Sequence, residues 1–532
     1  MNGGMKRGEI ARNVTRGAFF LAVEKVAALI SGMVYFALML RWLGPTNYGI
    51  LTLATSVTGF AAMLTLNFEV FLERYAAEYE SRGRLDLVTR ALGLSMALKV
   101  GLGLLASAVV LGLAPHLATQ FNVPQLTELL PVMVAMVACD GLYTTGRSLL
   151  FGIQRFEWVG GLSLIFHIAK TVMVGLLWWS KQGLMAMAFG LTVITVVQAV
   201  LFAGTAWFIM SRAPRTRRTP EQDEADGPML RQMMGYCLPL LGARAAFISG
   251  QNLGKLVLAK FIDATQLGYF TFAFQTIERF VELVYALPSV LLPSLTHLVA
   301  REERERLAWV FEEAFRLVQV AACAVAWGVF TFSPELTRYI GSPLFMPSLG
   351  MLQVLALVPI ARTAQQPLTM MFQAMRRPGV VFALALVKLG VELSCYFLFV
   401  KRLGGLGAAY ANLAGAVTSY LVALVLGGFV IPELAWRRAG AVVRALMLTL
   451  PMLGVSMLIM QDVPSLLWSI TLRALLMVPA LLAILALGLV TSHDLEKLSS
   501  LKVREPWLAR LRDIVVGATI RVALVFEPRR PA

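Results

Sequence analysis

The sequence has little charge and few of the residues that form catalytic centres in enzymes. Only 15% of its 532 residues are charged, and it contains four histidines. It has no Gly-Lys-Ser/Thr phosphate-binding loop, no serine nucleophile elbow and no His-Glu-x-x-His helix. These absences argue against ATP hydrolysis and covalent catalysis. We therefore expect a protein that is not an enzyme and that uses no cofactor.

Cysteine is also scarce. The four cysteines are Cys139, Cys237, Cys323 and Cys395, and each falls within an apolar run without the spacing of a metal site. We expect free, buried thiols and no disulfide framework. His167 and Lys170 share a predicted helix face, but no carboxylate is near them in sequence. Packing or cavity lining is therefore a better interpretation of His167 than a metal site.

What the chain has in abundance is apolar residues, in long continuous runs. Hydrophobic residues make up 58% of the sequence, and the mean hydropathy is +0.72. Runs of about 20 residues suit helices that cross about 30 Å of hydrocarbon, whereas a β-barrel would show alternation. We predict an all-α polytopic membrane protein with about fourteen transmembrane helices. Their approximate limits are 17–41, 47–70, 89–113, 127–150, 159–180, 184–210, 234–261, 266–298, 311–332, 347–374, 379–400, 405–431, 441–460 and 466–491.

The basic residues indicate how the chain is oriented. The net charge is +16, but most lysines and arginines lie between apolar runs, a pattern that indicates topology and not binding to nucleic acid. With the N-terminus inside, about 32 of them fall in inner segments and about 6 in outer turns. This bias predicts that both termini of the multi-pass protein are cytoplasmic.

The chain divides into five predicted parts. Residues 1–210 form an N-terminal six-helix lobe, 211–233 a cytoplasmic linker, 234–431 a C-terminal six-helix lobe, 432–491 two additional transmembrane helices, and 492–532 a cytoplasmic amphipathic tail. The linker is rich in proline, glycine and charge and has little to bury. The tail mixes apolar residues with arginine, which favours a helix on the anionic inner leaflet or one packed on cytoplasmic loops.

The two predicted lobes show a weak internal repeat. A shift of about 219 residues aligns residues 48–51 with 267–270 and Lys25 with Arg244, and a shift of about 221 aligns His167 with Lys388. An even number of spans separates equivalent points, so the lobes have the same predicted orientation. An axis along the membrane normal would relate them, with a cavity between them. That plan suits alternating access by rocking of the lobes.

Three motifs carry a resemblance to a known family. They are the Leu43-Gly44-Pro45-x-x-Tyr48-Gly49 turn, the charged inner segment Glu73 to Arg84, and the Phe151-Gly152-x-Gln154-Arg155 step after the fourth span. With the twelve-plus-two span count, they resemble the polysaccharide transporter branch of the multidrug/oligosaccharidyl-lipid/polysaccharide exporter superfamily, which includes O-antigen flippases and relatives of the lipid II flippase. The resemblance covers about residues 10–490.

This resemblance implies a function at the membrane. It implies translocation of undecaprenyl-diphosphate-linked glycan from the inner to the outer leaflet of a bacterial inner membrane. The product would serve cell-surface polysaccharides such as lipopolysaccharide. It also makes a polysaccharide polymerase or glycosyltransferase machinery a candidate partner, beside the lipid-linked glycan and the membrane lipids.

Charged residues inside the predicted spans also favour transport of a diphosphate-linked glycan. Nine cations outnumber six anions there, and a cavity with excess positive charge suits an anionic diphosphate. Arg244, Gln251 and Lys255 fall close to one line of the seventh span, at ~100° per residue. We expect these three to bind the substrate together with Lys25 and Arg279.

Carboxylates inside the spans are the candidates for coupling to an ion gradient. They are Glu24, Asp140, Glu278 and Glu282. A competing hypothesis is that Lys25 pairs with Glu24 or Glu278 and only holds the lobes together. Similarly, Glu282 would form a neutralised i, i+3 pair with Arg279. We interpret Lys388 and Glu392, at i, i+4, as a structural pair.

We predict a flippase for lipid-linked oligosaccharide. The alternative is an ion-coupled multidrug antiporter, whose cavity would be acidic or apolar to suit cationic drugs; the excess of buried cations favours the flippase. A membrane scaffold for glycan assembly is a third hypothesis, which the buried charges disfavour. We interpret the outer turn at Gly44-Pro45 as scaffold, because it needs only a helix break and a tight reversal.

Overall fold

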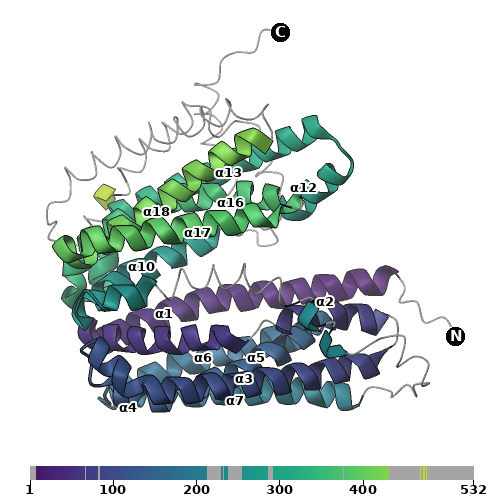
Figure 1. Ribbon diagram of the computed structural model, residues 1–532, viewed down its shortest axis with the longest axis horizontal. Helices are drawn as coiled ribbons and strands as arrows, with labels where there is room; N and C mark the ends of the chain where they lie inside the picture. Colours follow the sequence, from purple (N-terminus) through teal and green to yellow (C-terminus); the bar gives the residue numbers. More distant parts are fainter. Residues whose placement is uncertain are drawn as a thin grey trace, which may run out of the picture. The chain divides into compact units, whose positions relative to one another are not determined.

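The protein is helical throughout the part that the structure describes. The computed structural model describes residues 7–65, 68–81, 84–212, 229–231, 233–235, 237, 254–284, 291–375, 377–430, 468, 471–473 and 475 (Figure 1). No strand occurs among these residues. The predicted all-α fold class is confirmed.

The chain forms two compact units. The first unit comprises Met1–Thr271 with Tyr339–Phe345, and the second comprises Phe272–Arg338 with Met346–Ala532. The helices of the first unit are α1 (Arg7–Ala62), η1 (Met63–Thr65), α2 (Phe68–Ser81), α3 (Leu85–Gln120), α4 (Leu126–Met133), α5 (Ala135–Gly152), α6 (Phe156–Trp179) and α7 (Leu184–Ser211). The predicted division into lobes, linker, extra spans and tail stays a prediction.

The second unit contains the later helices. Helix α10 (Ala264–Val284) begins in the first unit and continues into the second. The others are α12 (Leu291–Ala300), α13 (Arg304–Thr331), α14 (Ser333–Leu336), η2 (Thr337–Gly341), η3 (Pro343–Ser348), α15 (Leu349–Leu355), α16 (Val358–Ala374), α17 (Pro378–Cys395), η4 (Tyr396–Val400) and α18 (Lys401–Val430). Segments η2 and η3 contribute Tyr339–Phe345 to the first unit.

Two of the longest helical runs are each broken by a glycine in a left-handed conformation. Helix α1 breaks at Gly44, with φ +67°, next to Pro45, and α18 breaks at Gly404, with φ +56°. Only glycine adopts these angles readily, and proline cannot continue the preceding helix. The break in α1 therefore falls at the predicted outer turn, between the predicted spans 17–41 and 47–70.

The helices are long and apolar enough to cross a membrane. Seven runs in the described part qualify, and an eighth is the bent pair Pro343–Leu355 and Val358–Ala374, with an angle of 41°. One run, Gly379–Phe429, has 51 residues, which at 1.5 Å per residue is over twice the length a bilayer needs. With its break at Gly404 it provides two spans, as predicted. The predicted spans 234–261, 441–460 and 466–491 lie largely outside the described residues, so the count of fourteen stays a prediction.

Large apolar side chains cover the outside of these helices. Leu105, Ile165, Phe189 and Phe397 are all more than half exposed, and Trp179 is 84% exposed. Such surfaces are unstable in water but match the hydrocarbon of a bilayer. The exposure pattern supports a multi-pass membrane protein.

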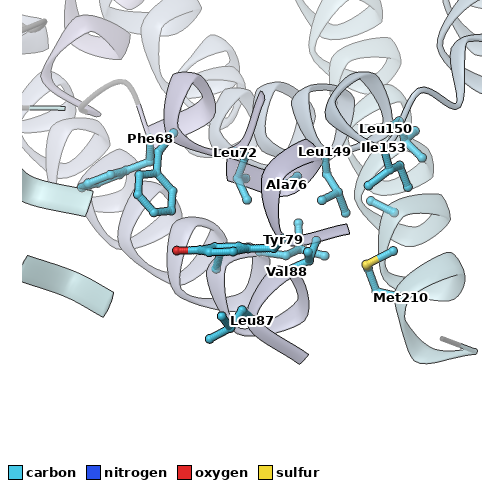
Figure 2. Close-up of a cluster of buried hydrophobic side chains, with 14 of the residues drawn as sticks. Phe68, Leu72, Ala76, Tyr79, Leu87, Val88, Leu149, Leu150, Ile153 and Met210 are labelled. Carbon is cyan, nitrogen blue, oxygen red and sulfur yellow. The ribbon is translucent and has the colours of Figure 1, made fainter. Parts of the chain in front are cut away.

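Inside the first unit, α2 packs into a core of apolar side chains. Phe68, Leu72 and Tyr79 of α2 gather against Val88 of α3 and Leu149 of α5 (Figure 2). Helix α2 has only 14 residues and four glutamates, so it does not qualify as a span. Its buried aromatic residues pack it against the spanning helices. This packing also places glutamates of α2 beside α3 and α5.

The first unit also contains a reciprocal backbone contact between two segments 219 residues apart. A Cβ added to Gly49 would lie 1.8 Å from the carbonyl oxygen of Ala264, and one added to Gly268 would lie 2.0 Å from that of Pro45. The hydroxyls of Thr46 and Thr265 are 2.9 Å apart. The equivalent residues are Pro45 and Ala264, Thr46 and Thr265, and Gly49 and Gly268. Each pair is separated by the offset of 219 residues that the sequence predicts. A residue pair that contacts its own equivalents is the signature of local two-fold symmetry.

A short segment of the first unit covers this contact. Phe345 packs edge-on against Tyr48, with ring centroids 6.3 Å apart, and against Tyr269, at 6.0 Å. The Arg41 guanidinium donates a hydrogen bond to the carbonyl oxygen of Tyr339. These contacts explain why Tyr339–Phe345 belongs to the first unit although its neighbours in sequence belong to the second.

All four cysteines are free thiols. Cys237 and Cys323 are buried, as expected, but Cys139 and Cys395 are only partly buried. The expectation of full burial was wrong for these two because membrane helices expose part of their apolar surface to lipid rather than to water.

We predict that Gly49→Ala and Gly268→Ala each destabilise the protein. The new Cβ would meet backbone carbonyls, which cannot move aside like a side chain, so we expect a loss of roughly 1–3 kcal/mol. Thermal unfolding of the purified protein in detergent measures this loss. The matched control is Gly101→Ala in α3, where an added Cβ meets nothing within 4 Å. Equal unfolding temperatures for Gly49→Ala and Gly101→Ala would contradict the contact.

Candidate functional site

Two deeply buried charges of the first unit form an ion pair. Lys99 of α3 places Nζ 2.6 Å from Oε2 of Glu69 in α2, and the two side chains are 2% and 8% exposed. Lys99 Nζ also donates to the hydroxyl of Thr144 in α5, at 2.7 Å. The ammonium therefore joins three helices. A buried charge is tolerated only with partners of this kind.

Helix α5 is shaped to hold this pair. Gly141 brings its backbone against α3, since a Cβ there would lie 2.8 Å from Cβ of Lys99. The Thr144 hydroxyl donates to the carbonyl oxygen of Asp140, at 2.7 Å, and Ser148 donates to Oε1 of Glu73, at 2.9 Å. Asp140, a predicted coupling residue, is partly buried on this same helix. Through Thr144, the backbone of Asp140 is thus linked to the pair of Lys99 and Glu69.

Glu24 and His167 form a second ionisable pair in the first unit. Glu24 is 6% exposed, and its Oε1 lies 4.0 Å from Nε2 of His167 in α6. Thr171, one turn further along α6, donates to the carbonyl oxygen of Ser31 in α1, at 3.1 Å. No carboxylate lies near His167 in sequence, but Glu24 lies near it in space because α1 and α6 pack against each other.

Lys25 points away from the carboxylate beside it. It is exposed, whereas Glu24 is buried, because consecutive residues on a helix lie ~100° apart. Glu24 faces His167, and the Glu278 carboxylate accepts a hydrogen bond from Arg362. Both carboxylates proposed as structural partners of Lys25 are therefore engaged elsewhere. Within the described residues, Lys25 forms no ion pair.

The rest of the predicted substrate-binding set is only partly described. Arg244 and Gln251 lie outside the described residues, and Lys255 is partly buried near the start of a short described helix. The stripe of Arg244, Gln251 and Lys255 and its apposition to Lys25 remain predictions.

In the second unit, two predicted carboxylates are paired with arginine. Glu278 of α10 pairs with Arg362 of α16, and both side chains are mostly buried. Arg279 lies 3.8 Å from Glu282, and these side chains are 33% and 59% exposed. The i, i+3 pair considered in the sequence is therefore present. Arg279 still has a buried Nε without a hydrogen bond, so its guanidinium is not saturated by Glu282.

Lys388 and Glu392 of α17 do not form the predicted structural pair. The Glu392 Oε1 accepts hydrogen bonds from the Tyr396 hydroxyl, at 2.7 Å, and from Nδ2 of Asn412, at 2.9 Å. Its Oε2 is buried without a hydrogen bond. In the structure the hydrogen bonds of Glu392 thus come from two neutral donors and not from the lysine.

Arg473 makes a contact that the sequence did not reveal. Its Nε lies 2.7 Å from Oε1 of Glu335 in α14, and its guanidinium donates to the carbonyl oxygen of Thr331 at the end of α13. This ties the start of the predicted fourteenth span to the second unit. No group of three His, Cys, Asp or Glu side chains suited to a metal occurs in the part of the chain that the structure describes.

Comparison with known proteins places these features in context. A family model described as polysaccharide biosynthesis protein matches residues 38–342, more than half of the chain. No curated protein sequence matches the chain. Two solved structures have a similar fold at low sequence identity.

One similar structure is an inward-facing multidrug resistance MATE family transporter of the MOP superfamily. Its TM-score is 0.65 at 14% identity, covering 79% of this chain and 98% of that one. The other is the lipid II flippase MurJ in an inward closed conformation, with a TM-score of 0.64 at 14% identity, covering 88% and 98%. Both similarities show that this chain shares the fold of those two proteins.

We predict that breaking the buried ion pair from either side is costly. Lys99→Met or Glu69→Gln alone removes one member of the buried pair and breaks its ion pair, so each should lose about 3–5 kcal/mol of stability. The double variant removes both charges and should recover most of that loss. Thermal unfolding of the three variants provides the double-mutant cycle.

The matched control is the exposed pair Arg306 and Glu303, which lie 2.9 Å apart on α13 and its cap. Arg306→Met should change stability by no more than about 1 kcal/mol, because solvent screens exposed pairs. Additive losses at Lys99 and Glu69 would show that the two do not form one buried unit.

Proposed function

Because the chain belongs to the polysaccharide biosynthesis protein family, we propose that it is a flippase for polyprenyl-diphosphate-linked oligosaccharide. The family match over residues 38–342 carries this proposal, and the transporter fold supports it. Together they confirm the family resemblance inferred from the sequence. In this proposal the protein moves a polysaccharide repeat unit, such as that of O-antigen, across the bacterial inner membrane, and both termini are cytoplasmic.

The chemistry of the cargo suggests which residues bind it. A diphosphate is a compact anion that lysine and arginine recognise through charge-assisted hydrogen bonds. We assign this role to Lys25, Arg244, Gln251, Lys255 and Arg279. Two described features support the assignment: Lys25 forms no ion pair with a described residue, and the Arg279 guanidinium keeps an unsatisfied Nε. The polyprenyl tail would remain in the lipid while the head group crosses.

Transport would proceed by alternating access. The reciprocal contact of Gly49 and Gly268 is made by backbone and two hydroxyls, and Phe345 packs against Tyr48 and Tyr269 across it. We place a gate here, whose opening would separate the two segments and release one of these ring contacts. The Thr46 and Thr265 hydroxyls would then exchange their mutual hydrogen bond for water.

The energy source would be an ion gradient sensed by buried carboxylates. Among the predicted coupling residues, Glu24 fits best, because it is 6% exposed and its Oε2 has no hydrogen bond. Asp140 lies beside the Lys99 network. Glu278 pairs with Arg362, and Glu282 pairs with Arg279 and is 59% exposed.

We predict that the reconstituted protein moves labelled polyprenyl-diphosphate glycan between leaflets. The measurement is the fraction of label that becomes accessible to an enzyme or quencher outside proteoliposomes, against protein-free vesicles. Lys25→Glu should reduce this movement strongly, since it places a negative charge beside the diphosphate. Arg306→Glu, on the exposed end of α13, is the matched control and should leave it unchanged.

Two outcomes would count against the flippase. Absence of movement for every lipid-linked glycan, with efflux of cationic dyes, would favour the multidrug antiporter instead. Absence of both activities in well-folded protein would favour a scaffold for glycan assembly.

We also predict that a disulfide across the outer contact stops transport. The Thr46 and Thr265 oxygens are 2.9 Å apart, so cysteines at both positions are close enough to be oxidised. Oxidised Thr46→Cys/Thr265→Cys protein should lose glycan movement, and a reductant should restore it. Thr46→Cys alone, treated identically, is the control. Full transport by the cross-linked protein would show that this contact need not open.

A further inference from the structure

Glu392 is a buried carboxylate in which one of the two oxygens has no hydrogen-bond partner. The residue is 3% exposed in α17, and its Oε2 is buried with no hydrogen bond. Its Oε1 accepts from Tyr396 and Asn412, both neutral donors. An ionised carboxylate with one bare oxygen in a buried site is strongly destabilised. Adding a proton to Oε2 removes that cost.

The neighbouring charges leave Glu392 with one counterion, and that counterion is not in contact. Glu278 and Arg362 neutralise each other in the same unit. Lys388 lies one turn before Glu392 on the same face of α17, at the i, i+4 spacing. It forms no hydrogen bond or ion pair with a described residue. Its flexible four-carbon stem allows the ammonium to approach or leave the carboxylate.

Packing keeps this part of α17 close to α18. A Cβ added to Gly415 of α18 would lie 3.0 Å from the carbonyl oxygen of Lys388 and 3.2 Å from Cβ of Glu392. The glycine thus allows α18 to approach α17 beside Glu392. Because Oε2 is buried, its charge has to be balanced by a protein group or by a proton.

We propose that Glu392 and Lys388 form a proton-binding site in the second unit, and that proton binding there is coupled to transport. In one state Glu392 is ionised and the Lys388 ammonium moves toward Oε2. In the other, a proton taken from water at one membrane face binds Oε2 and gives a neutral carboxylic acid, while Lys388 keeps its charge. The site gains one positive charge. The coupling to transport rests on the proposed function; the proton site does not.

The donor set favours a proton over a metal ion. Sodium or calcium would need several oxygen ligands around one point. Here Tyr396 and Asn412 present hydrogen-bond donors to Glu392, and the Lys388 ammonium would repel a cation. The other titratable or charged groups that the described, adjacent helices bring to this region are Glu278, Arg362, Cys395 and Tyr420. Glu278 and Arg362 already form a pair, and the last two are not charged when protonated.

Infrared difference spectroscopy of the reconstituted full chain tests the proton site directly. Between high and low pH, the wild type should gain a carboxylic-acid C=O band that Glu392→Gln lacks. Lys388→Met removes the ammonium and leaves the carboxylate in place, so it should keep the band. Glu313→Gln, which removes a carboxylate bound to Arg316 at 2.7 Å, is the matched control and should keep the band unchanged. A band that persists in well-folded Glu392→Gln overturns the site.

Glycan movement under an imposed pH gradient tests the coupling. Wild type and Glu313→Gln should respond to the gradient, whereas Glu392→Gln should lose the response. A Glu392→Gln protein that lacks the infrared band yet keeps its full gradient response overturns the coupling. If no variant, including the wild type, moves any glycan while the band behaves as expected, the proposed function fails and the proton site stands.

Discussion

A charge buried in a bundle of membrane helices must be neutralised or solvated by groups of that same bundle, since lipid offers neither. In the first unit this requirement is met by Lys99, which holds Glu69 of α2 and Thr144 of α5 at once. The result is structural as well as electrostatic. Helix α2 is too short to span a membrane, so its place beside α3 and α5 depends on this pair and on the apolar cluster of Phe68 and Leu72.

The same requirement separates structural charges from those available for function. Lys99 and Glu69 satisfy each other, as do Glu278 and Arg362, and such pairs have little freedom to bind anything else. Lys25, the Nε of Arg279 and the Oε2 of Glu392 are not satisfied in this way within the described residues. Groups of this second kind can bind cargo or a proton without first breaking an ion pair. Among the proposed residues that the structure describes, Lys25, Arg279 and Glu392 are of this kind.

Much of the fold follows from local sequence features. Apolar runs give the spans of α3 to α7 within a few residues, and Gly44-Pro45 gives the break in α1, because run length and proline chemistry act locally. The offset of 219 residues pointed to equivalent glycines, and the structure shows why both must be glycine: each faces a backbone carbonyl of the other segment. That reason is not visible in the sequence, where the match between residues 48–51 and 267–270 is weak.

The partners of the charges were much less predictable than the helices. Pairing Lys388 with Glu392 followed the i, i+4 rule, which describes isolated helices, but Tyr396 and Asn412 compete for the same carboxylate oxygen. Glu24 with His167, and Arg473 with Glu335, join residues whose helices meet only in the folded protein. No spacing rule reaches across such distances, so side-chain pairing between helices has to come from the structure.

Equivalent positions of the internal repeat carry different ionisable residues in the two units. At the offset of 221, His167 of α6 corresponds to Lys388 of α17, and Thr171 to Glu392. In the first unit Thr171 uses its hydroxyl to tie α6 to the Ser31 carbonyl, and the acid facing His167 comes from α1. In the second unit the acid is on α17 itself, and Asn412 of α18 also donates to it. Proton binding at Glu392 is therefore linked to the packing of α17 against α18, and such a link is what a coupling group in an alternating-access transporter requires.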